Sequence, residues 1–273
     1  MNVQLRPYEI REPSAPEIPL LVSIPHTGTC VPDAIAADFA SDYIRSLPMT
    51  DWHLHHLYDF LPALGVTTIY ATYSRFVADL NRPPDNAPLY PGRFETGFVA
   101  LRTFQGEEIY RVPPSAEEIT RRRTLVHIPY HAKLLELIQS KIMRFGRVVL
   151  IDAHSVASRA NLLHGELKEH IYLGDRDGRS CAPWLVDAAE RGLLESHYTL
   201  TRNHPYKGGY ITEHYGQLEQ VEALQIEMCQ RVYMDEDDPA RGLGHPNFTQ
   251  AKARIRAVLE TVRAETLRQR AGW

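Results

Sequence analysis

Residues 147–155 read Arg147-Val148-Val149-Leu150-Ile151-Asp152-Ala153-His154-Ser155. The unbroken run of β-branched and apolar residues is too short for an independent helix. It predicts a strand that is buried on both faces inside a parallel or mixed sheet. Open α/β sheets bind ligands at the carboxyl ends of such strands, and this strand brings Asp152, His154 and Ser155 to that edge. A histidine there suits a metal ligand or a catalytic base, although a buried histidine with a satisfied hydrogen bond explains this segment equally well.

The length, composition and net charge of the chain limit the class of protein. The 273 residues, 44% of them hydrophobic, suffice for one large α/β domain or two small ones. The net charge of −4, from 30 basic and 34 acidic residues, argues against a nucleic-acid or anionic-membrane partner. No apolar run approaches the ~20 residues of a transmembrane helix, and residues 1–19 lack the apolar core of a signal peptide. Because the three cysteines stand far apart, we expect a reducing, cytoplasmic location.

The sequence shows no internal repeat and no clear linker, so we expect a single domain over 1–273, either monomeric or a small homo-oligomer.

Further strands and helices follow from the hydrophobic pattern. In the last core strand, Gln225 and Glu227 share one face, and an acid inside an apolar strand must be paired or functional. The predicted strands are 19–24, 66–71, 147–155, 171–174, 198–201 and 221–228, and the main helices are 51–61, 115–138, 183–194 and 247–268.

Two further polar positions accompany these elements. His26 lies in the loop that leaves the strand at 19–24, and Asp51 stands at the start of the predicted helix 51–61. Thr50 or Asp51 is suited to cap that helix. The three histidines within it, His53, His55 and His56, form a polar helix face more simply than a metal site. Asp51 is the better candidate for a metal ligand.

Residues 74–84, Ser-Arg-Phe-Val-Ala-Asp-Leu-Asn-Arg-Pro-Pro, alternate like a strand and leave it in an extended conformation at Pro83-Pro84. Arg75 and Arg82 suit bidentate capture of a carboxylate, although a surface strand with ordinary ion pairs fits the same pattern. Further along, Gly208 and Gly209 allow a sharp turn or a close approach of the backbone to a ligand.

Together these residues fit one type of catalytic site. Two histidines and a carboxylate are the usual protein ligands of a catalytic zinc with an open water position. A further glutamate beside such a metal would act as the general base for water, and nearby arginines would hold an anionic substrate. The constellation predicts metal-assisted hydrolysis of an acidic amide.

Seven motifs, in order along the chain, resemble the N-formylglutamate amidohydrolase (N-formylglutamate deformylase) family. They are Ser23-Ile-Pro-His-Thr-Gly, Thr50-Asp-Trp-His, Ser74-Arg-Phe-Val-Ala-Asp-Leu-Asn-Arg-Pro, Pro129-Tyr-His, Asp152-Ala-His-Ser, Lys207-Gly-Gly-Tyr-Ile-Thr and Gln225-Ile-Glu. The resemblance implies release of formate and glutamate from N-formyl-L-glutamate, the last step of one histidine-degradation route. It also implies the three-layer fold of the zinc carboxypeptidases and phosphorylase/hydrolase-like proteins, with a mixed sheet between helices.

The resemblance also implies roles for individual residues. Zn²⁺ or another divalent metal would bind His26 and His154, with Asp51 as the chosen third ligand and His131 in reserve as a ligand or proton shuttle. Glu227 would activate water, and Arg75 would lie near the carbonyl or a carboxylate of the substrate, a small acidic N-acyl amino acid. The substrate would be held by Asn81, Arg82, Arg75, Arg102, Lys207, Gly208 and Gly209.

Two other functions stay open. A related hydrolase would remove another acyl group from an acidic amino acid, and a non-catalytic protein on the same fold would only bind such a ligand. The presence of His26, His154 and Glu227 argues against the second.

Overall fold

Strand β4 (Val148–Val156) lies at the centre of a seven-stranded mixed sheet with the strand order β1-β3-β2-β4-β7-β5-β6. The computed structural model describes residues 5–89, 92 and 94–270. The remaining strands are β1 (Tyr8–Arg11), β2 (Leu20–Ile24), β3 (Thr67–Ala71), β5 (Ile171–Gly174), β6 (Leu200–Arg202) and β7 (Val221–Cys229). Every residue of β2, β4 and β7 is buried, and this includes the polar residues Gln225 and Glu227 of β7. The apolar runs of β2 and of the first half of β4 predict this burial.

The strand directions bring the functional residues to one edge. Strands β3, β2, β4 and β7 are parallel neighbours, whereas β1 and β5 pair antiparallel at the two flanks. In the register of β4 and β7, Asp152 lies opposite Gln225 and His154 lies opposite Glu227. The polar side chains of the three central strands therefore meet at their carboxyl ends.

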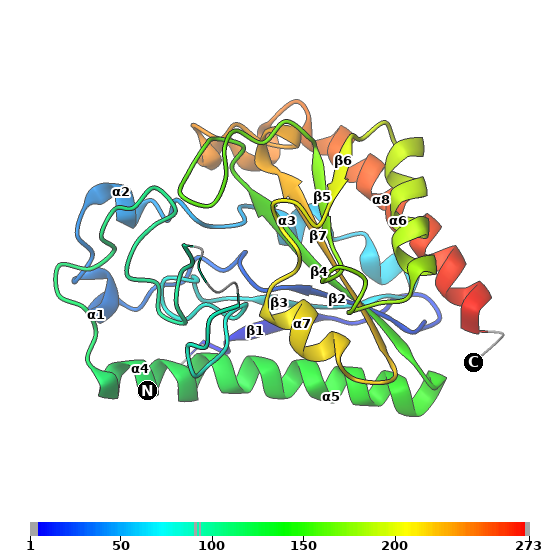
Figure 1. The fold of residues 1–273 in the computed structure, drawn as a ribbon, viewed down its shortest axis with the longest axis horizontal. Coiled ribbons are helices and arrows are strands. Elements are labelled where there is room, and N and C mark those ends of the chain that lie inside the picture. Colours follow the sequence, from blue (N-terminus) through cyan, green and yellow to red (C-terminus); the bar gives the residue numbers. More distant parts are fainter. Residues whose placement is uncertain (1–4, 90–91, 93, 271–273) are drawn as a thin grey trace.

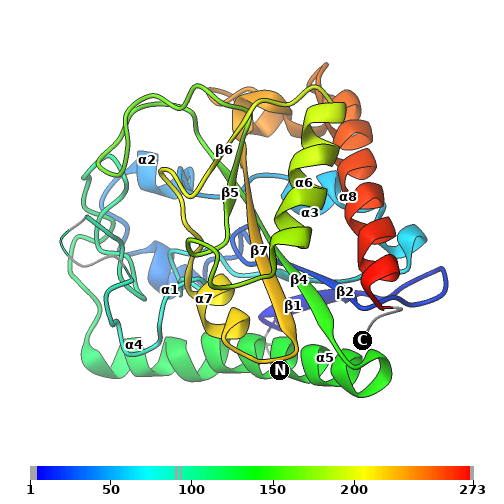
Figure 2. The same ribbon diagram turned by 45° about the vertical axis from the view of Figure 1, so that its right-hand side comes forward.

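Helices cover both faces of the sheet (Figures 1 and 2). On one face α5 (Ile128–Phe145) and α7 (Tyr210–Gly216) pack against Val148, Leu150 and Ala223. On the other face α6 (Pro183–Glu195) and α8 (Phe248–Arg270) pack against Val149 and Ile151. The alternate residues of β4 thus contribute to two separate cores. The predicted α/β class, a mixed sheet between helical layers, is confirmed.

The other helices are short. They are α1 (Asp33–Ala36), α2 (Asp42–Arg45), α3 (Leu54–Leu57), α4 (Ala116–Arg122), a π-helical turn (Arg123–His127), and the 3₁₀ turns η1 (Leu61–Leu64), η3 (Gln230–Val232) and η4 (Pro239–Gly244). Ser115 caps α4, because its hydroxyl accepts the backbone N–H of Glu118 at 3.2 Å. Among the helices of the described residues, none combines the length and apolar character that a membrane span requires.

Two predicted elements differ from the structure. The helix predicted over 51–61 is replaced by α3 and η1. His53, with φ of 59°, keeps the residues before it out of α3, and Tyr58, with φ of −99° and ψ of 14°, ends α3. The strand predicted within 74–84 is a series of turns, in which Val77 N–H bonds the carbonyl of Ser74 and Arg82 N–H bonds that of Asp79. Its alternating pattern arises because Phe76 and Leu80 turn into the core while Arg75 and Asp79 pair with each other.

Candidate active site

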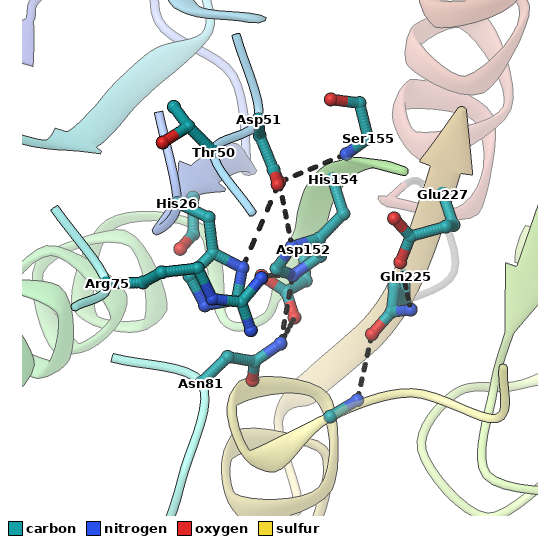
Figure 3. A network of polar contacts seen from close by, with 12 residues as sticks. His26, Thr50, Asp51, Arg75, Asn81, Asp152, His154, Ser155, Gln225 and Glu227 are labelled. Atoms are coloured by element: carbon teal, nitrogen blue, oxygen red, sulfur yellow. Dashed lines mark hydrogen bonds and ion pairs between the residues drawn. The ribbon is translucent and has the colours of Figure 1, made fainter. Parts of the chain in front are cut away.

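Three buried side chains from distant parts of the sequence converge at the carboxyl edge of the sheet. His26 follows β2, Asp51 precedes α3, and His154 lies in β4; each is at most 3% exposed. Their possible ligand atoms all lie within 4.8 Å of one another. Oδ2 of Asp51 is 3.2 Å from Nδ1 of His154 and 3.9 Å from Nδ1 of His26 (Figure 3). These are the three residues predicted as metal ligands, and in the described part of the chain they form the group suited to hold a metal.

The far nitrogen of each histidine faces a second carboxylate. Nε2 of His26 is 2.7 Å from Oδ1 of Asp79, and Nε2 of His154 is 3.1 Å from Oδ1 of Asp152. Both aspartates are fully buried. For His26, an Nε2–H donated to Asp79 leaves the Nδ1 lone pair free, and the Nδ1 atoms of both histidines face Asp51. Carboxylate partners of this kind fix the tautomer and the ring orientation of metal-binding histidines, so the donor set fits a divalent metal.

The charges around the two histidines differ. Burial and the neighbouring Arg75 lower the pKa of His26, although Asp79 partly opposes them. Burial would also lower the pKa of His154, but the carboxylates of Asp152 and Asp51 raise it well above its usual value. The His154 side of the cluster therefore has an excess of negative charge that a proton or a cation would neutralise.

Asp51 is held by the turn that replaces the predicted helix start. Its backbone N–H donates to the carbonyl of His26 at 3.0 Å, and Oδ2 accepts the backbone N–H of Ser155 at 3.0 Å. The neighbouring histidines take other partners: Nε2 of His53 is 2.8 Å from the carbonyl of Pro239, and Nδ1 of His55 is 2.7 Å from Oγ1 of Thr27. The interpretation of this histidine run as polar rather than metal-binding agrees with these contacts.

Glu227 projects from β7 beside the cluster. It is 7% exposed, and its Oε2 accepts Nε2–H of Gln225 at 3.1 Å. Burial raises the pKa of Glu227 to about 8; His154 and Arg75 lower it, whereas Asp51 raises it. A cation bound among the three ligands would lower this pKa further, in the direction that favours a carboxylate base.

The segment after β3 supplies Arg75, Asn81 and Arg82. Arg75 is 6% exposed and donates to Oδ2 of Asp79 at 2.7 Å, while its Nε has no hydrogen-bond partner among the described residues. The amide of Asn81 is engaged on both sides: Oδ1 accepts Ile211 N–H at 2.8 Å, and Nδ2 lies 3.3 Å from Oδ2 of Asp152. Both arginines and Asn81 line the cavity described next.

A cavity of about 660 Å³ opens above the cluster. His26, Asp51, His154 and Glu227 lie in its wall, and Gly208 and Gly209 line it too. Much of the remaining wall comes from two irregular segments, 94–105 and 157–169, and the second of these contributes Lys168. The hydroxyl of Tyr206, another lining residue, is buried without a hydrogen-bond partner in the described part of the chain.

Three predicted residues lie outside this cavity. Arg102 is exposed and pairs with Glu108 at 2.6 Å, and Lys207 pairs with Asp177 at 2.8 Å. Arg102 pairs with a carboxylate six residues away, and Lys207 pairs with one in the loop after β5, and neither cation lines the cavity. His131 is buried behind the site, with Nε2 2.9 Å from the carbonyl of Leu80, and does not belong to the group of possible metal ligands.

Sequence reasoning assigned no role to several groups that complete the site. Asp79 and Asp152 orient the two histidines, Gln225 binds Glu227, and Tyr206 offers a free hydroxyl. The spacing of two residues between Asp152 and His154, and between Gln225 and Glu227, was the available signal, since strand residues two apart share a face. No comparable signal marks Tyr206, which lies in an irregular loop.

Comparison with known proteins agrees with this geometry. Residues 18–234 match the model of a family described as N-formylglutamate amidohydrolase. A protein of Pseudomonas aeruginosa named N-formylglutamate deformylase is 42% identical over 227 residues, which are 81% of this chain and 84% of that protein. One of Pseudomonas putida with the same name is 38% identical over 250 residues, 89% of this chain and 92% of that protein.

Solved structures show the same fold. The crystal structure of an N-formylglutamate amidohydrolase from Ralstonia eutropha superposes with a TM-score of 0.84 at 30% identity, covering 98% of this chain and all of that one. A gene product of Agrobacterium tumefaciens, 22% identical, superposes with a TM-score of 0.66 over 92% of this chain and 96% of its own, and it shows the fold alone.

Proposed function

The chain belongs to the N-formylglutamate amidohydrolase family, and from this premise we propose that it hydrolyses N-formyl-L-glutamate to formate and L-glutamate with the help of a divalent metal. The observation that carries the metal dependence is the buried group of His26, Asp51 and His154, whose two imidazoles are each backed by a carboxylate. Two histidines and one carboxylate are a ligand set of catalytic zinc sites, so zinc is the first candidate. As the family resemblance implies, the reaction would end a histidine-degradation route.

A metal held there would polarise the formyl carbonyl and lower the pKa of a water molecule. The protein's own groups would do the rest. Glu227 would take the proton of the attacking water and deliver it to the leaving amine nitrogen, as its position beside the metal ligands allows. Glu227 is 7% exposed and faces the cavity in which the substrate would bind.

The cations of the cavity wall would hold the two carboxylates of the substrate. Arg82, whose Nε and one terminal nitrogen are bonded to the carbonyls of Thr96 and Asn81, is held in place for this role. Arg75 keeps an unpartnered Nε beside the metal ligands, suited to a carboxylate or to the developing oxyanion. Lys168 replaces Lys207 and Arg102 as the candidate for the remaining carboxylate, since it lines the cavity and they do not.

The amide of Asn81 supports the site differently from the sequence-based expectation. Its groups are bonded to Ile211 and Asp152, and Nδ2 lies 2.9 Å from Nε2 of His154. We therefore propose that Asn81 holds the metal-binding side of the site, while Arg82 makes the main contact with the substrate.

Formate release from N-formyl-L-glutamate tests the proposal directly. Purified protein is assayed as isolated, after treatment with a chelator, and after restoration with zinc. Release that the chelator abolishes and zinc restores is the expected result. Release that survives complete metal removal would contradict the metal dependence. A parallel panel of N-acetyl- and N-succinyl-L-glutamate distinguishes a deformylase from a deacylase of longer acyl groups, and metal binding without turnover of any substrate would indicate a binding protein.

A further inference from the structure

Gln225 lies in β7, two residues before Glu227 and directly opposite Asp152 of β4. It is 4% exposed. Its Oε1 accepts the backbone N–H of Gly209 at 2.8 Å, and its Nε2 donates to Oε2 of Glu227 at 3.1 Å (Figure 3). The side chain therefore connects the turn ahead of α7 with the carboxylate beside the metal ligands.

These two contacts determine which way the amide points. A backbone N–H can only donate, so the oxygen of the amide must face Gly209. The NH₂ group must then face Glu227, where an ionised carboxylate can only accept. The two contacts are consistent with one orientation of the amide, and the flipped orientation would lose both.

We propose that Gln225 is the positioning residue of the catalytic base, holding Oε2 of Glu227 so that Oε1 accepts the proton of the attacking water. This inference rests on the proposed function. Gln225 does not need to touch the substrate; it acts by holding one oxygen of a carboxylate whose side chain would otherwise sample several rotamers in the cavity wall. A donor to the ionised form also stabilises the carboxylate in a buried position.

The same turn orients a second amide on the other side of the site. Ile211 N–H binds Oδ1 of Asn81, which turns Nδ2 toward Asp152 and His154. Gly209 has no room for a side chain, because a Cβ there would lie 2.3 Å from Nδ2 of Asn81. The backbone of 209–211 thus fixes both the amide that supports Glu227 and the amide beside His154.

The test compares Gln225→Met, Glu227→Ala and the double variant in formate release, with metal content measured for each. Met nearly preserves the volume and removes both the donor to Glu227 and the oxygen that accepts Gly209 N–H. We expect Gln225→Met to lower kcat by about 10- to 100-fold, the loss typical of groups that orient active-site residues, and to change KM by less than about twofold. In the double variant, the residual kcat should equal that of Glu227→Ala, because Gln225 has nothing left to orient.

The matched control is Glu222→Gln. Glu222 is also buried in β7, but at its other end, where it pairs with Arg147 at 2.8 Å. Its substitution should leave kcat unchanged. Gln225→Glu is the second variant: it keeps an oxygen for Gly209 N–H but puts a carboxyl group against Glu227, and kcat should fall at least as far.

The outcomes separate the inference from the proposed function. A wild-type protein that releases no formate would refute the proposed function. An active wild type whose kcat survives Gln225→Met, or a double variant that loses a further 10-fold over Glu227→Ala, would refute the positioning role alone. A fall in kcat accompanied by an equal loss of bound metal would also overturn it, since the effect would then pass through the metal ligands.

Discussion

Replacing Glu227 by Gln should remove activity and, at the same time, stabilise the metal-free protein. Burial raises the pKa of the Glu227 carboxyl from 4.5 to about 8; the carboxylates of Asp51 and Asp152 add to the rise, and His154 opposes it. The unfolded chain returns the group to the usual value. The folded protein therefore holds a proton that the unfolded chain releases over the pH range from 4.5 to 8.

The sign of the effect follows from this difference. Because the folded-state pKa is the higher one, the wild type loses stability as pH rises through this window, and the loss levels off above pH 8. Each unit between the two pKa values corresponds to about 1.4 kcal/mol. At pH 7 the wild-type carboxyl costs about 3 kcal/mol relative to a neutral side chain, and below pH 4.5 it costs nothing. Gln has the same shape, still accepts the donor of Gln225, and does not titrate.

The assay is urea unfolding of both proteins, treated with chelator, at pH 5, 6, 7 and 8. We expect the unfolding free energy of Glu227→Gln to exceed that of the wild type by an amount that grows across the series. Added zinc should shrink the difference, because a cation beside Glu227 lowers its pKa. In the formate assay, kcat should fall by about 10²- to 10⁴-fold, as for loss of a general base. If the difference in unfolding free energy between Glu227→Gln and the wild type stayed constant with pH, this result would refute the argument. The destabilisation would then come from the shape of the side chain and not from the burial of its charge.

Three further substitutions test the ligands and the substrate contacts. Asp51→Ala should abolish stoichiometric zinc binding and formate release, and retention of both would exclude Asp51 as the third ligand. Asp79→Asn should weaken zinc binding by about 10- to 100-fold, because Asp79 orients the imidazole of His26. The control is Asp175→Asn, which changes another fully buried aspartate paired with an arginine and should leave the zinc affinity unchanged. Arg82→Met should raise KM for N-formyl-L-glutamate by about 10- to 100-fold, the equivalent of one charge-assisted hydrogen bond, whereas Arg102→Met should leave KM unaltered because Arg102 faces Glu108 outside the cavity.

The parts of the site that lie on strands were predictable from the sequence. Continuous apolar runs indicate buried parallel strands, and the polar residues at their ends must meet, as His26, His154 and Glu227 do. Spacing of two residues likewise places Gln225 beside Glu227.

The irregular segments were harder to predict, because a local pattern does not say which partner a charged side chain will choose. Arg102 pairs with Glu108, and Lys207 pairs with Asp177 of a nearby loop. No periodic pattern in the sequence predicts such ion pairs. The helix predicted at 51–61 shrinks to one turn because His53 adopts positive φ before it and Tyr58 leaves the helical conformation after it, and helix propensity does not reveal either.

The cavity is lined partly by residues of central strands and partly by residues of loops. This difference determines how the substrate preference of such an enzyme can change. His26, His154 and Glu227 stand on or next to β2, β4 and β7, which are buried along their whole length, whereas much of the surrounding wall comes from the loops 94–105 and 157–169. Loops tolerate insertion and replacement far better than central strands. A shift in the preferred acyl or amino acid portion can therefore arise by exchanging loop residues, while the hydrolytic machinery is inherited unaltered. Libraries that randomise these two loops alone are the economical route to new deacylases on this scaffold.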